Sequence, residues 1–241
     1  MIILGSTSEV AQAFVEKALT AGEKFPKIYL VTSSRETTER FAQHIDVKFL
    51  QPSEIIELDL TQEINYSVFE NVDSDLLFCA TGYLGLGTED GLYDDKNTEK
   101  IIDINYAKLV PVINYFAKKM EIKRSGNIIA LSSVAGDRGR QSNFIYGSAK
   151  AAFTAYLSGL RNYLFSKKVH VMTVKPGFME TKMTEGLPLN PKLTATPKQA
   201  AECIYKAYKK QKNIVYVLPI WRLIMLIIIH IPEFIFKKLK L

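Results

Sequence analysis

The 241-residue sequence is poor in the residues that build metal sites and disulfide frameworks. It has two cysteines, Cys79 and Cys203, and three histidines, no two of which lie within five residues of each other. These residues lack the spacing of a zinc site, and there are too few cysteines for a disulfide-stabilised miniprotein. We therefore expect free thiols in a reducing compartment and no metal centre.

Glycine and proline are also scarce. Thirteen glycines and nine prolines are too few for a fibrous or low-complexity chain, whereas 47% hydrophobic and 23% charged residues are typical of a globular protein. A chain of this length can bury a complete core, and we find no linker or internal repeat that divides it. The sequence predicts one main domain, residues 1–218, followed by a tail, residues 219–241.

The excess positive charge is confined to the end of the chain. The formal net charge is +6, and residues 200–241 carry all of it, with eight lysines and arginines against two glutamates. Nucleic-acid-binding proteins usually carry their basic residues on the folded body, whereas here they accompany apolar residues. The pattern favours contact of the tail with a membrane surface and argues against nucleic acid as a partner.

The segment 214–236 is apolar but unsuited to span a membrane. Its charged residues are Arg222 and Glu233, lysines bracket it, and two prolines interrupt it. A spanning helix needs roughly 20 continuous apolar residues. We expect an apolar, basic helical tail lying in the plane of the inner membrane surface of a cytoplasmic protein, since no leader peptide opens the chain. The alternative is a strand and helix buried in a subunit interface.

Short apolar runs alternate with helical patterns along the chain, as expected for repeated strand–helix–strand units. The runs are almost entirely apolar, which is typical of parallel strands covered by helices on both faces. The expected fold class is α/β, with a single doubly wound, parallel, seven-stranded sheet. The expected strands are 2–4, 28–32, 55–58, 76–80, 127–131, 169–174 and 214–218, and the expected helices are 9–21, 37–43, 64–70, 98–122, 144–166 and 197–210.

Two long loops, 82–95 and 177–196, interrupt this alternation. Loops of this length in a compact domain usually form lids or sites. Ligands of open parallel sheets bind beyond the carboxyl ends of the strands, and both of these loops should emerge there. We therefore expect the site at that edge of the sheet.

The turn that follows the first strand suits a phosphate group. Residues 5–10 open a helix, whose N-terminal amides can bind phosphate, and three hydroxyl residues add donors, although Glu9 would repel an anion. The alternative is a helix capped by Ser or Thr without a ligand. After the second strand, Ser34 and Arg35 occupy the place where an acidic residue would bind a free ribose hydroxyl, which favours NADPH over NADH.

Tyr146 and Lys150 are spaced by one helical turn, so that an ammonium can lower the pKa of a phenol. The spacing alone is weak evidence for a catalytic pair, because the chain repeats it at Tyr115/Lys119, Tyr163/Lys167, Tyr205/Lys209 and Tyr208/Lys212. Tyr146 differs from the others in having Ser133 thirteen residues earlier, at the end of an apolar strand. Ser133 could bind a substrate carbonyl while Tyr146 donates the proton.

Taken in their order along the chain, the turn at 5–10, Ser34 and Arg35, and the set Ser133, Tyr146 and Lys150 resemble the short-chain dehydrogenase/reductase family. The resemblance implies a Rossmann-type domain that binds NADPH and reduces a ketone to a secondary alcohol. It also implies a catalytic tetrad of Ser133, Tyr146, Lys150 and Asn105. The cofactor-binding residues that it implies are Gly5, Ser6, Thr7, Ser8, Glu9, Val10, Ser34, Arg35, Asp59, Leu60, Ala80, Thr81, Gly82, Tyr146, Lys150, Pro176, Gly177 and Thr181. The chain departs from the usual glycine turn, because Glu9 and Ala11 replace two of its glycines.

Within the family, a narrower similarity points to reductases of a 2-keto pentofuranose carried on polyprenyl phosphate, which act in cell-envelope polysaccharide synthesis. It rests on the segments 5–10, 82–85, 104–106, 143–148 and 230–239. Two alternatives remain open: a general ketoacyl, steroid or free-sugar ketone reductase, and a non-catalytic dinucleotide-binding sensor or scaffold. The family also implies a homodimer or homotetramer, and the chemistry leaves room for a partner oxidase.

Overall fold

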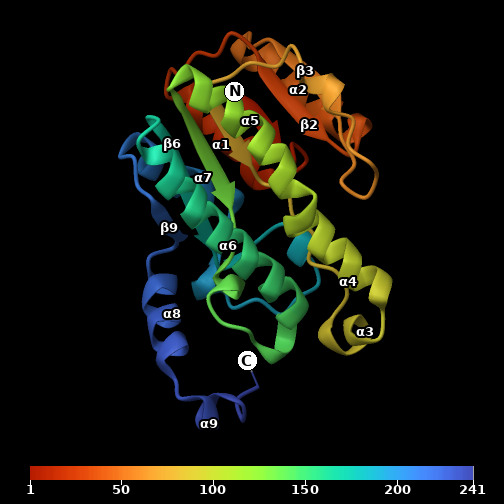
Figure 1. The fold of residues 1–241 in the computed structure, drawn as a ribbon, viewed down its shortest axis with the longest axis vertical. Coiled ribbons are helices and arrows are strands. Elements are labelled where there is room, and N and C mark those ends of the chain that lie inside the picture. Colours follow the sequence, from red (N-terminus) through yellow and green to blue (C-terminus); the bar gives the residue numbers. More distant parts are fainter. Residues whose placement is uncertain (241) are drawn as a thin grey trace.

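The computed structural model describes residues 1–240, apart from the side chains of residues 88 and 89, around a seven-stranded sheet in which all neighbouring strands are parallel (Figure 1). The strand order is β3-β2-β1-β4-β5-β6-β9. The strands are β1 (Ile2–Leu4), β2 (Ile28–Thr32), β3 (Ser53–Glu57), β4 (Leu76–Cys79), β5 (Gly126–Leu131), β6 (Val169–Pro176) and β9 (Ile214–Val217). The expected α/β class and seven-stranded sheet are confirmed. The order reverses between β1 and β4, and such a reversal opens a crevice for ligands.

Helices cover both faces of the sheet (Figure 1). One layer holds α1 (Glu9–Thr20), α2 (Arg35–Phe49) and α7 (Pro197–Lys209), and the other holds α5 (Leu109–Lys123) and α6 (Phe144–Phe165). Side chains alternate along a strand, so Ile3 joins the first core while Ile2 and Leu4 join the second. In the first core, the rings of Phe14 and Phe78 stack with their centroids 4.4 Å apart. Apolar burial on both faces holds the strand ends that carry the site.

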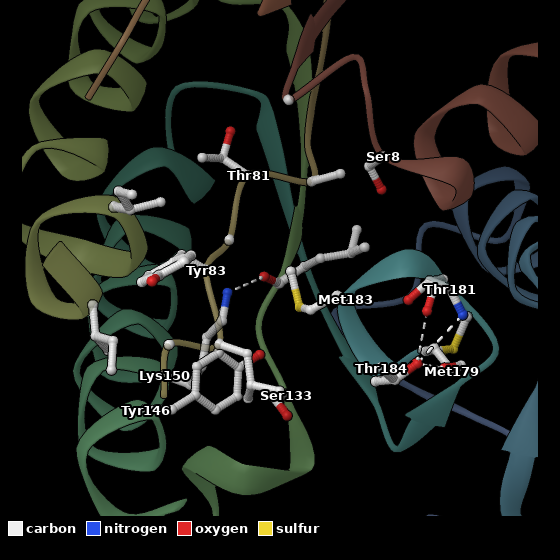
Figure 2. A pocket seen from close by; sticks show the side chains of 18 of the residues that line it. Ser8, Thr81, Tyr83, Ser133, Tyr146, Lys150, Met179, Thr181, Met183 and Thr184 are labelled. Carbon is white, nitrogen blue, oxygen red and sulfur yellow. Dashed lines mark hydrogen bonds between the residues drawn. The ribbon is translucent and has the colours of Figure 1, made fainter. Parts of the chain in front are cut away.

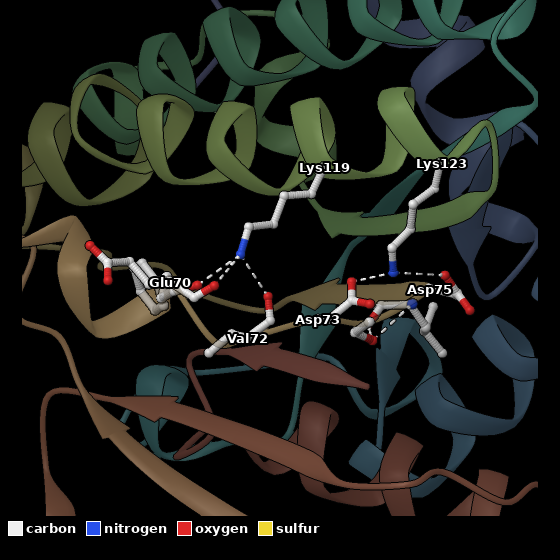
Figure 3. Close-up of polar contacts among 9 residues, drawn as sticks. Glu70, Val72, Asp73, Asp75, Lys119 and Lys123 are labelled. Carbon is white, nitrogen blue, oxygen red and sulfur yellow. Dashed lines mark hydrogen bonds and ion pairs between the residues drawn. The ribbon is translucent and has the colours of Figure 1, made fainter.

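The expected helix 64–70 is wrong, because the chain forms only the 3-10 turn η1 (Tyr66–Phe69). The Asn65 side chain accepts a hydrogen bond from the amide of Ser67 and so caps the start of this short turn. At the other end, the Lys119 ammonium donates to three carbonyl oxygens, those of residues 69, 70 and 72, at 2.9, 3.0 and 2.9 Å (Figure 3). These carbonyls are satisfied from α5, so no further helical turn is needed to pair them.

The expected helix 98–122 is longer and is interrupted. It comprises α4 (Asp95–Ile102), the π-helical turn η2 (Asp103–Ala107) and α5. Within the turn, the Asn105 carboxamide nitrogen donates to the carbonyl oxygen of Ile101 at 2.9 Å. Single π-helical turns inside longer helices occur often at functional sites. This turn brings Asn105 into the buried interior, next to the loop that follows β4.

Both long loops contain short regular elements. The first contains α3 (Thr88–Leu92), and the second contains the strands β7 (Phe178–Met179) and β8 (Thr194–Ala195), which pair with each other. The tail is helical as expected, with α8 (Ile220–His230) and α9 (Glu233–Phe236) following β9. In the described part of the chain, no helix has the length and apolar character that crossing a membrane requires.

Candidate active site

A cavity of about 1140 Å³ opens beyond the carboxyl ends of β1, β4, β5 and β6 (Figure 2). Its wall is formed by the turn after β1, the segment after β2, the loop after β4, the loop between β5 and α6, and part of the loop 177–189. The position agrees with the reversal of strand order between β1 and β4. The cavity therefore lies at the edge of the sheet where the sequence predicts the site.

The turn after β1 forms one end of the cavity. Gly5 has φ of +81°, and a Cβ atom at this position would lie 2.8 Å from the backbone nitrogen of Thr81. Only glycine accepts this positive φ and also lacks the Cβ atom that would clash with Thr81. The turn can therefore lie directly against the loop after β4. Thr7, Ser8 and Val10 line the cavity beside it. The N-terminus of α1 thus opens into the cavity, a place where backbone amides can bind phosphate.

Two residues of this turn form hydrogen bonds with other segments of the chain. The Glu9 carboxylate accepts a hydrogen bond from the backbone amide of Lys182 at 2.9 Å, which directs it toward the loop 177–196. Ser6 is fully buried, and its hydroxyl lies 3.2 Å from the hydroxyl of Thr38 on α2. Ser6 therefore joins the turn to α2 and does not line the cavity, contrary to its expected role as a phosphate donor.

The end of β2 supplies hydroxyl groups and no carboxylate. Ser33, Ser34 and Thr37 line the cavity, and the Ser34 hydroxyl donates to that of Thr37 at 3.1 Å. Arg35 does not line the cavity, since its Nε donates to a Glu57 carboxylate oxygen at 2.6 Å. That hydrogen bond raises the pKa of Arg35. The structure therefore brings Ser34, but not Arg35, to the expected position, and sequence reasoning missed Ser33 and Thr37.

Asp59 and Leu60 follow β3 and line the same end of the cavity. One Asp59 carboxylate oxygen accepts hydrogen bonds from the backbone amide and the hydroxyl of Thr61, both at 2.8 Å. Leu60 is buried with 6% of its surface exposed. This corner therefore pairs a short apolar wall with an acceptor that local hydrogen bonds fix in place.

Ser133, Tyr146 and Lys150 converge on the opposite wall (Figure 2). Ser133 caps the turn η3 (Val134–Gly136) by accepting a hydrogen bond from the amide of Ala135 at 3.1 Å. A Cβ atom on Gly136 would lie 2.6 Å from the backbone carbon of Lys150, so η3 rests directly on α6. This close approach brings the end of β5 to the helix that carries Tyr146 and Lys150.

Burial sets the protonation of this group. Lys150 is 2% exposed, its Nζ donates to the Leu131 carbonyl at 3.2 Å, and it lies 5.7 Å from the centroid of the Tyr146 ring. Burial raises the pKa of Tyr146 to about 12, with the Ser133 side chain acting against it, and lowers the pKa of Lys150 to about 8. The expectation that Lys150 lowers the pKa of Tyr146 is therefore not met in this structure, because desolvation has the larger effect. A phenol with this pKa is protonated at neutral pH.

Asn105 lies behind the cavity wall. It is fully buried, its Oδ1 accepts from the Tyr83 amide at 3.3 Å, and its Nδ2 donates to the Tyr83 carbonyl at 2.7 Å. A Cβ atom on Gly82 would lie 3.3 Å from the Asn105 Oδ1 and 3.5 Å from the Lys150 Nζ. Asn105 thus fixes the loop after β4, where Ala80, Thr81 and Gly82 line the cavity beside Lys150.

The loop after β6 forms the far end of the cavity. Pro176, Gly177 and Thr181 line it, and the Thr181 side chain caps the turn η5 (Lys182–Thr184). Gly177 lies against the ring of Trp221 from α8, whose Nε1 donates to the Leu193 carbonyl at 3.0 Å. The Trp221 ring also meets Phe178 edge to face, with centroids 5.2 Å apart. One tail residue therefore fastens both ends of this loop.

The tail is also fastened to the loop between β5 and α6. The Arg138 guanidinium donates to the carbonyl oxygens of Ile228 at 2.7 Å and Ile231 at 2.6 Å, at the end of α8. It pairs with the Glu233 carboxylate at 2.9 Å and lies 3.6 Å from the centroid of the Phe236 ring. Sequence reasoning missed Arg138 and Trp221, and the one usable signal was that Trp221 is the single tryptophan of the chain.

Comparisons with known proteins agree with this architecture. A model of the short chain dehydrogenase family matches residues 1–192. An uncharacterized oxidoreductase of Mycobacterium tuberculosis is 30% identical over 146 residues, which cover 61% of this chain and 58% of that relative. An uncharacterized oxidoreductase of Streptomyces coelicolor is 27% identical over 247 residues, covering 99% of this chain and 95% of that relative.

The fold also matches solved structures. A short-chain dehydrogenase from Sphingobium yanoikuyae, solved in complex with NADPH, superimposes with a TM-score of 0.80 at 16% sequence identity, covering 96% of each chain. The family model spans β1 to β6, the loops of the cavity and the residues Ser133, Tyr146 and Lys150. This protein belongs to the short chain dehydrogenase family of oxidoreductases.

Proposed function

We propose that this protein is an NADPH-dependent ketone reductase whose substrate is a keto-sugar, a 2-keto pentofuranose linked to polyprenyl phosphate. The observation that carries the proposal is the convergence of Ser133, Tyr146 and Lys150 on the wall of a cavity that begins at the N-terminus of α1. The product would be a secondary alcohol with defined stereochemistry. The activity is that of a decaprenylphosphoryl-2-keto-erythropentose reductase in cell-envelope polysaccharide synthesis.

The donor groups along the cavity fit a dinucleotide. The amides at the start of α1 suit a pyrophosphate, and the glycine at position 5 keeps that turn free of a side chain. Ser33, Ser34 and Thr37 suit a 2′-phosphate, because they offer hydroxyl donors and no carboxylate faces that phosphate from the end of β2. Asp59 and Leu60 would border the adenine, and the segments 80–82, 176–177 and Thr181 would border the nicotinamide half.

A bound reduced nicotinamide supplies a hydride to the ketone carbon. The Ser133 hydroxyl would donate a hydrogen bond to the substrate carbonyl and orient it. The Tyr146 phenol is protonated at neutral pH, and burial, which raises its pKa to about 12, keeps it so; it would give its proton to the carbonyl oxygen as charge develops there. Lys150 would stabilise the phenolate that remains, and Asn105 would act as a positioning residue through the loop after β4.

The proposed reaction is tested with a defined substrate. Purified protein is given a short-chain prenylphosphoryl 2-keto pentose with NADPH or NADH, and cofactor oxidation is followed by absorbance. We expect turnover that prefers NADPH and is much faster than with ketoacyl, steroid or free-sugar ketones at equal concentration. Equal or faster turnover of a ketone without the lipid would favour the general reductase. NADPH binding without turnover of any ketone would favour a dinucleotide-binding sensor.

The tail supports a membrane-surface location for the same enzyme. Four of its apolar side chains expose 53% to 66% of their surface, namely Leu223, Leu226, Ile227 and Phe234. Arg222 and the lysines at 237, 238 and 240 are exposed around them. Two copies meeting through this face would bring like charges together, whereas anionic lipid headgroups complement them. We assign this face to an anionic membrane surface, so that the protein is a peripheral cytoplasmic enzyme.

Co-sedimentation with vesicles tests this location. We expect the protein to pellet with vesicles that contain phosphatidylglycerol and to remain in the supernatant with phosphatidylcholine alone. The variant Leu223→Ser/Ile227→Ser should lose binding, because it removes exposed apolar area without touching Trp221 or Met225. The exposed pair Lys118 and Lys210, changed to Gln, serves as a charge control that leaves binding intact. Equal pelleting with both lipids, or binding by the serine variant, would contradict this location.

The long helices α4, α5 and α6 are the proposed contact between subunits of a homodimer or homotetramer. Their outward side chains include Ile122 and Phe165, both 83% exposed. A partner oxidase that forms the ketone is compatible with this chemistry, since oxidation of a secondary alcohol followed by hydride addition to the opposite face of the ketone inverts its centre.

A further inference from the structure

Arg140 is an arginine of the cavity wall that forms no ion pair with the described side chains. It lies in the loop between β5 and α6, directly before the 3-10 turn η4 (Gln141–Asn143), and it lines the cavity with Ser142 and Asn143. Its Nε is buried and has no hydrogen-bond partner among the described residues, and neither has the buried Oδ1 of Asn143. Burial lowers the pKa of Arg140.

Other partly buried arginines of this chain have acceptors. Arg138 donates to carbonyl oxygens at the end of α8 and pairs with Glu233. The Arg161 Nε donates to the Val171 carbonyl at 2.7 Å. A buried N–H group without an acceptor is costly, because it gives up hydration and receives no hydrogen bond in return, and this is the state of the Arg140 Nε. Unlike these arginines, Arg140 lacks a hydrogen-bond acceptor for its Nε among the described residues, and a bound anion would provide one.

The carboxylate that acts on the pKa of Arg140 already has two other partners. Asp137 influences the pKa of Arg140, but its two oxygens accept hydrogen bonds from the buried ammonium of Lys175 and from the Tyr216 hydroxyl, the latter at 2.9 Å. The carboxylates that line the cavity are Glu9 and Asp59, which belong to the segments after β1 and β3. Among the described residues, the part of the wall between Ser133 and Tyr146 thus contains a cation and no acid.

We propose that Arg140 binds the phosphate group of the substrate. This inference deepens the proposed function and rests on it, since the phosphate is the one that links the keto-sugar to its polyprenyl chain. The planar guanidinium can donate two parallel hydrogen bonds to phosphate oxygens, a geometry that a lysine ammonium does not reproduce. Arg140 lines the same cavity as Ser133 and Tyr146, so a phosphate bound to it would hold the sugar in the cavity that contains both. Arg140 is then a specificity-determining residue that selects phosphate-linked ketones.

Binding of a simple prenyl phosphate tests the inference without requiring turnover. Calorimetry compares farnesyl phosphate and farnesol, each added to the NADPH-loaded wild type and to Arg140→Gln, Arg140→Lys and the exposed control Arg40→Gln. We expect Arg140→Gln to weaken farnesyl phosphate binding by about 10- to 100-fold, because a charge-assisted hydrogen bond is lost, and to leave farnesol binding unchanged. Arg140→Lys should recover part of the affinity, and Arg40→Gln should match the wild type.

Kinetics then separate this inference from the proposed function. With the prenylphosphoryl keto pentose, Arg140→Gln should raise KM at nearly constant kcat, whereas reduction of a neutral ketone should be unaffected. If the lipid-linked sugar is not reduced but farnesyl phosphate binding still depends on Arg140, the proposed substrate fails and the phosphate site stands. Equal farnesyl phosphate affinity in wild type, Arg140→Gln and Arg140→Lys, with unchanged melting temperatures, would overturn the inference.

Discussion

Replacing Tyr146 by phenylalanine is expected to lower kcat about a thousandfold, which corresponds to about 4 kcal/mol of transition-state stabilisation. The change removes one hydroxyl and keeps the ring that packs near Lys150, whose Nζ lies 5.7 Å from the ring centroid. The Lys150 ammonium is held in place by the hydrogen bond that its Nζ donates to the Leu131 carbonyl at 3.2 Å, so we do not expect it to replace the phenol as the proton donor. NADPH binding should persist, since the donors at the start of α1 are untouched.

The chain provides its own controls for this experiment. Tyr115 and Tyr163 each precede a lysine by one helical turn, as Tyr146 does, but neither lines the cavity. Tyr115→Phe and Tyr163→Phe should therefore retain wild-type kcat. NADPH affinity is measured by fluorescence titration of all three variants. A Tyr146→Phe variant with wild-type kcat would remove Tyr146 from the mechanism, whatever its effect on KM.

The sheet and the convergence of the catalytic residues were predictable because local sequence determines them. Each apolar run is long enough for a strand, and parallel strands bring their carboxyl ends to one edge, so Ser133 at the end of β5 had to lie at that edge. The spacing of Tyr146 and Lys150 on one helix required no tertiary information. The turn η3 packs directly on α6 because Gly136 has no side chain, and this contact brings Ser133 close to Tyr146 and Lys150.

Other features depend on contacts between distant segments, which a single sequence does not reveal. The helix expected at 64–70 stops at a 3-10 turn because Lys119, fifty residues later, binds its carbonyl oxygens. Arg35 faces away from the cavity because Glu57 on β3 holds it. The pKa of Tyr146 rises because tertiary packing buries it, and this effect outweighs the opposing hydrogen bond with the Ser133 side chain.

The attachment of the tail to the loop after β6 also depends on contacts between distant segments, and it leads to a second strong prediction. Trp221→Ala is expected to lower the free energy of unfolding by about 3–5 kcal/mol, because it empties a buried site and removes the hydrogen bond to the Leu193 carbonyl. Gly177→Ala should lower it by about 1–3 kcal/mol, since the new Cβ would lie 1.9 Å from the Trp221 ring. Both variants should also lower kcat/KM, because the loop after β6 lines the cavity.

The two changes act on one contact, so their effects should not add. Once Trp221 is alanine, the methyl group of Gly177→Ala has space, and the double variant should be about as stable as Trp221→Ala alone. Gly159→Ala is the matched control: its Cβ meets nothing within 4 Å on α6, and it should raise stability by about 0.5–1 kcal/mol. Urea unfolding of the four variants measures these values. Additive losses would mean that Gly177 is constrained by something other than Trp221, and the tail would then not control the loop through this ring.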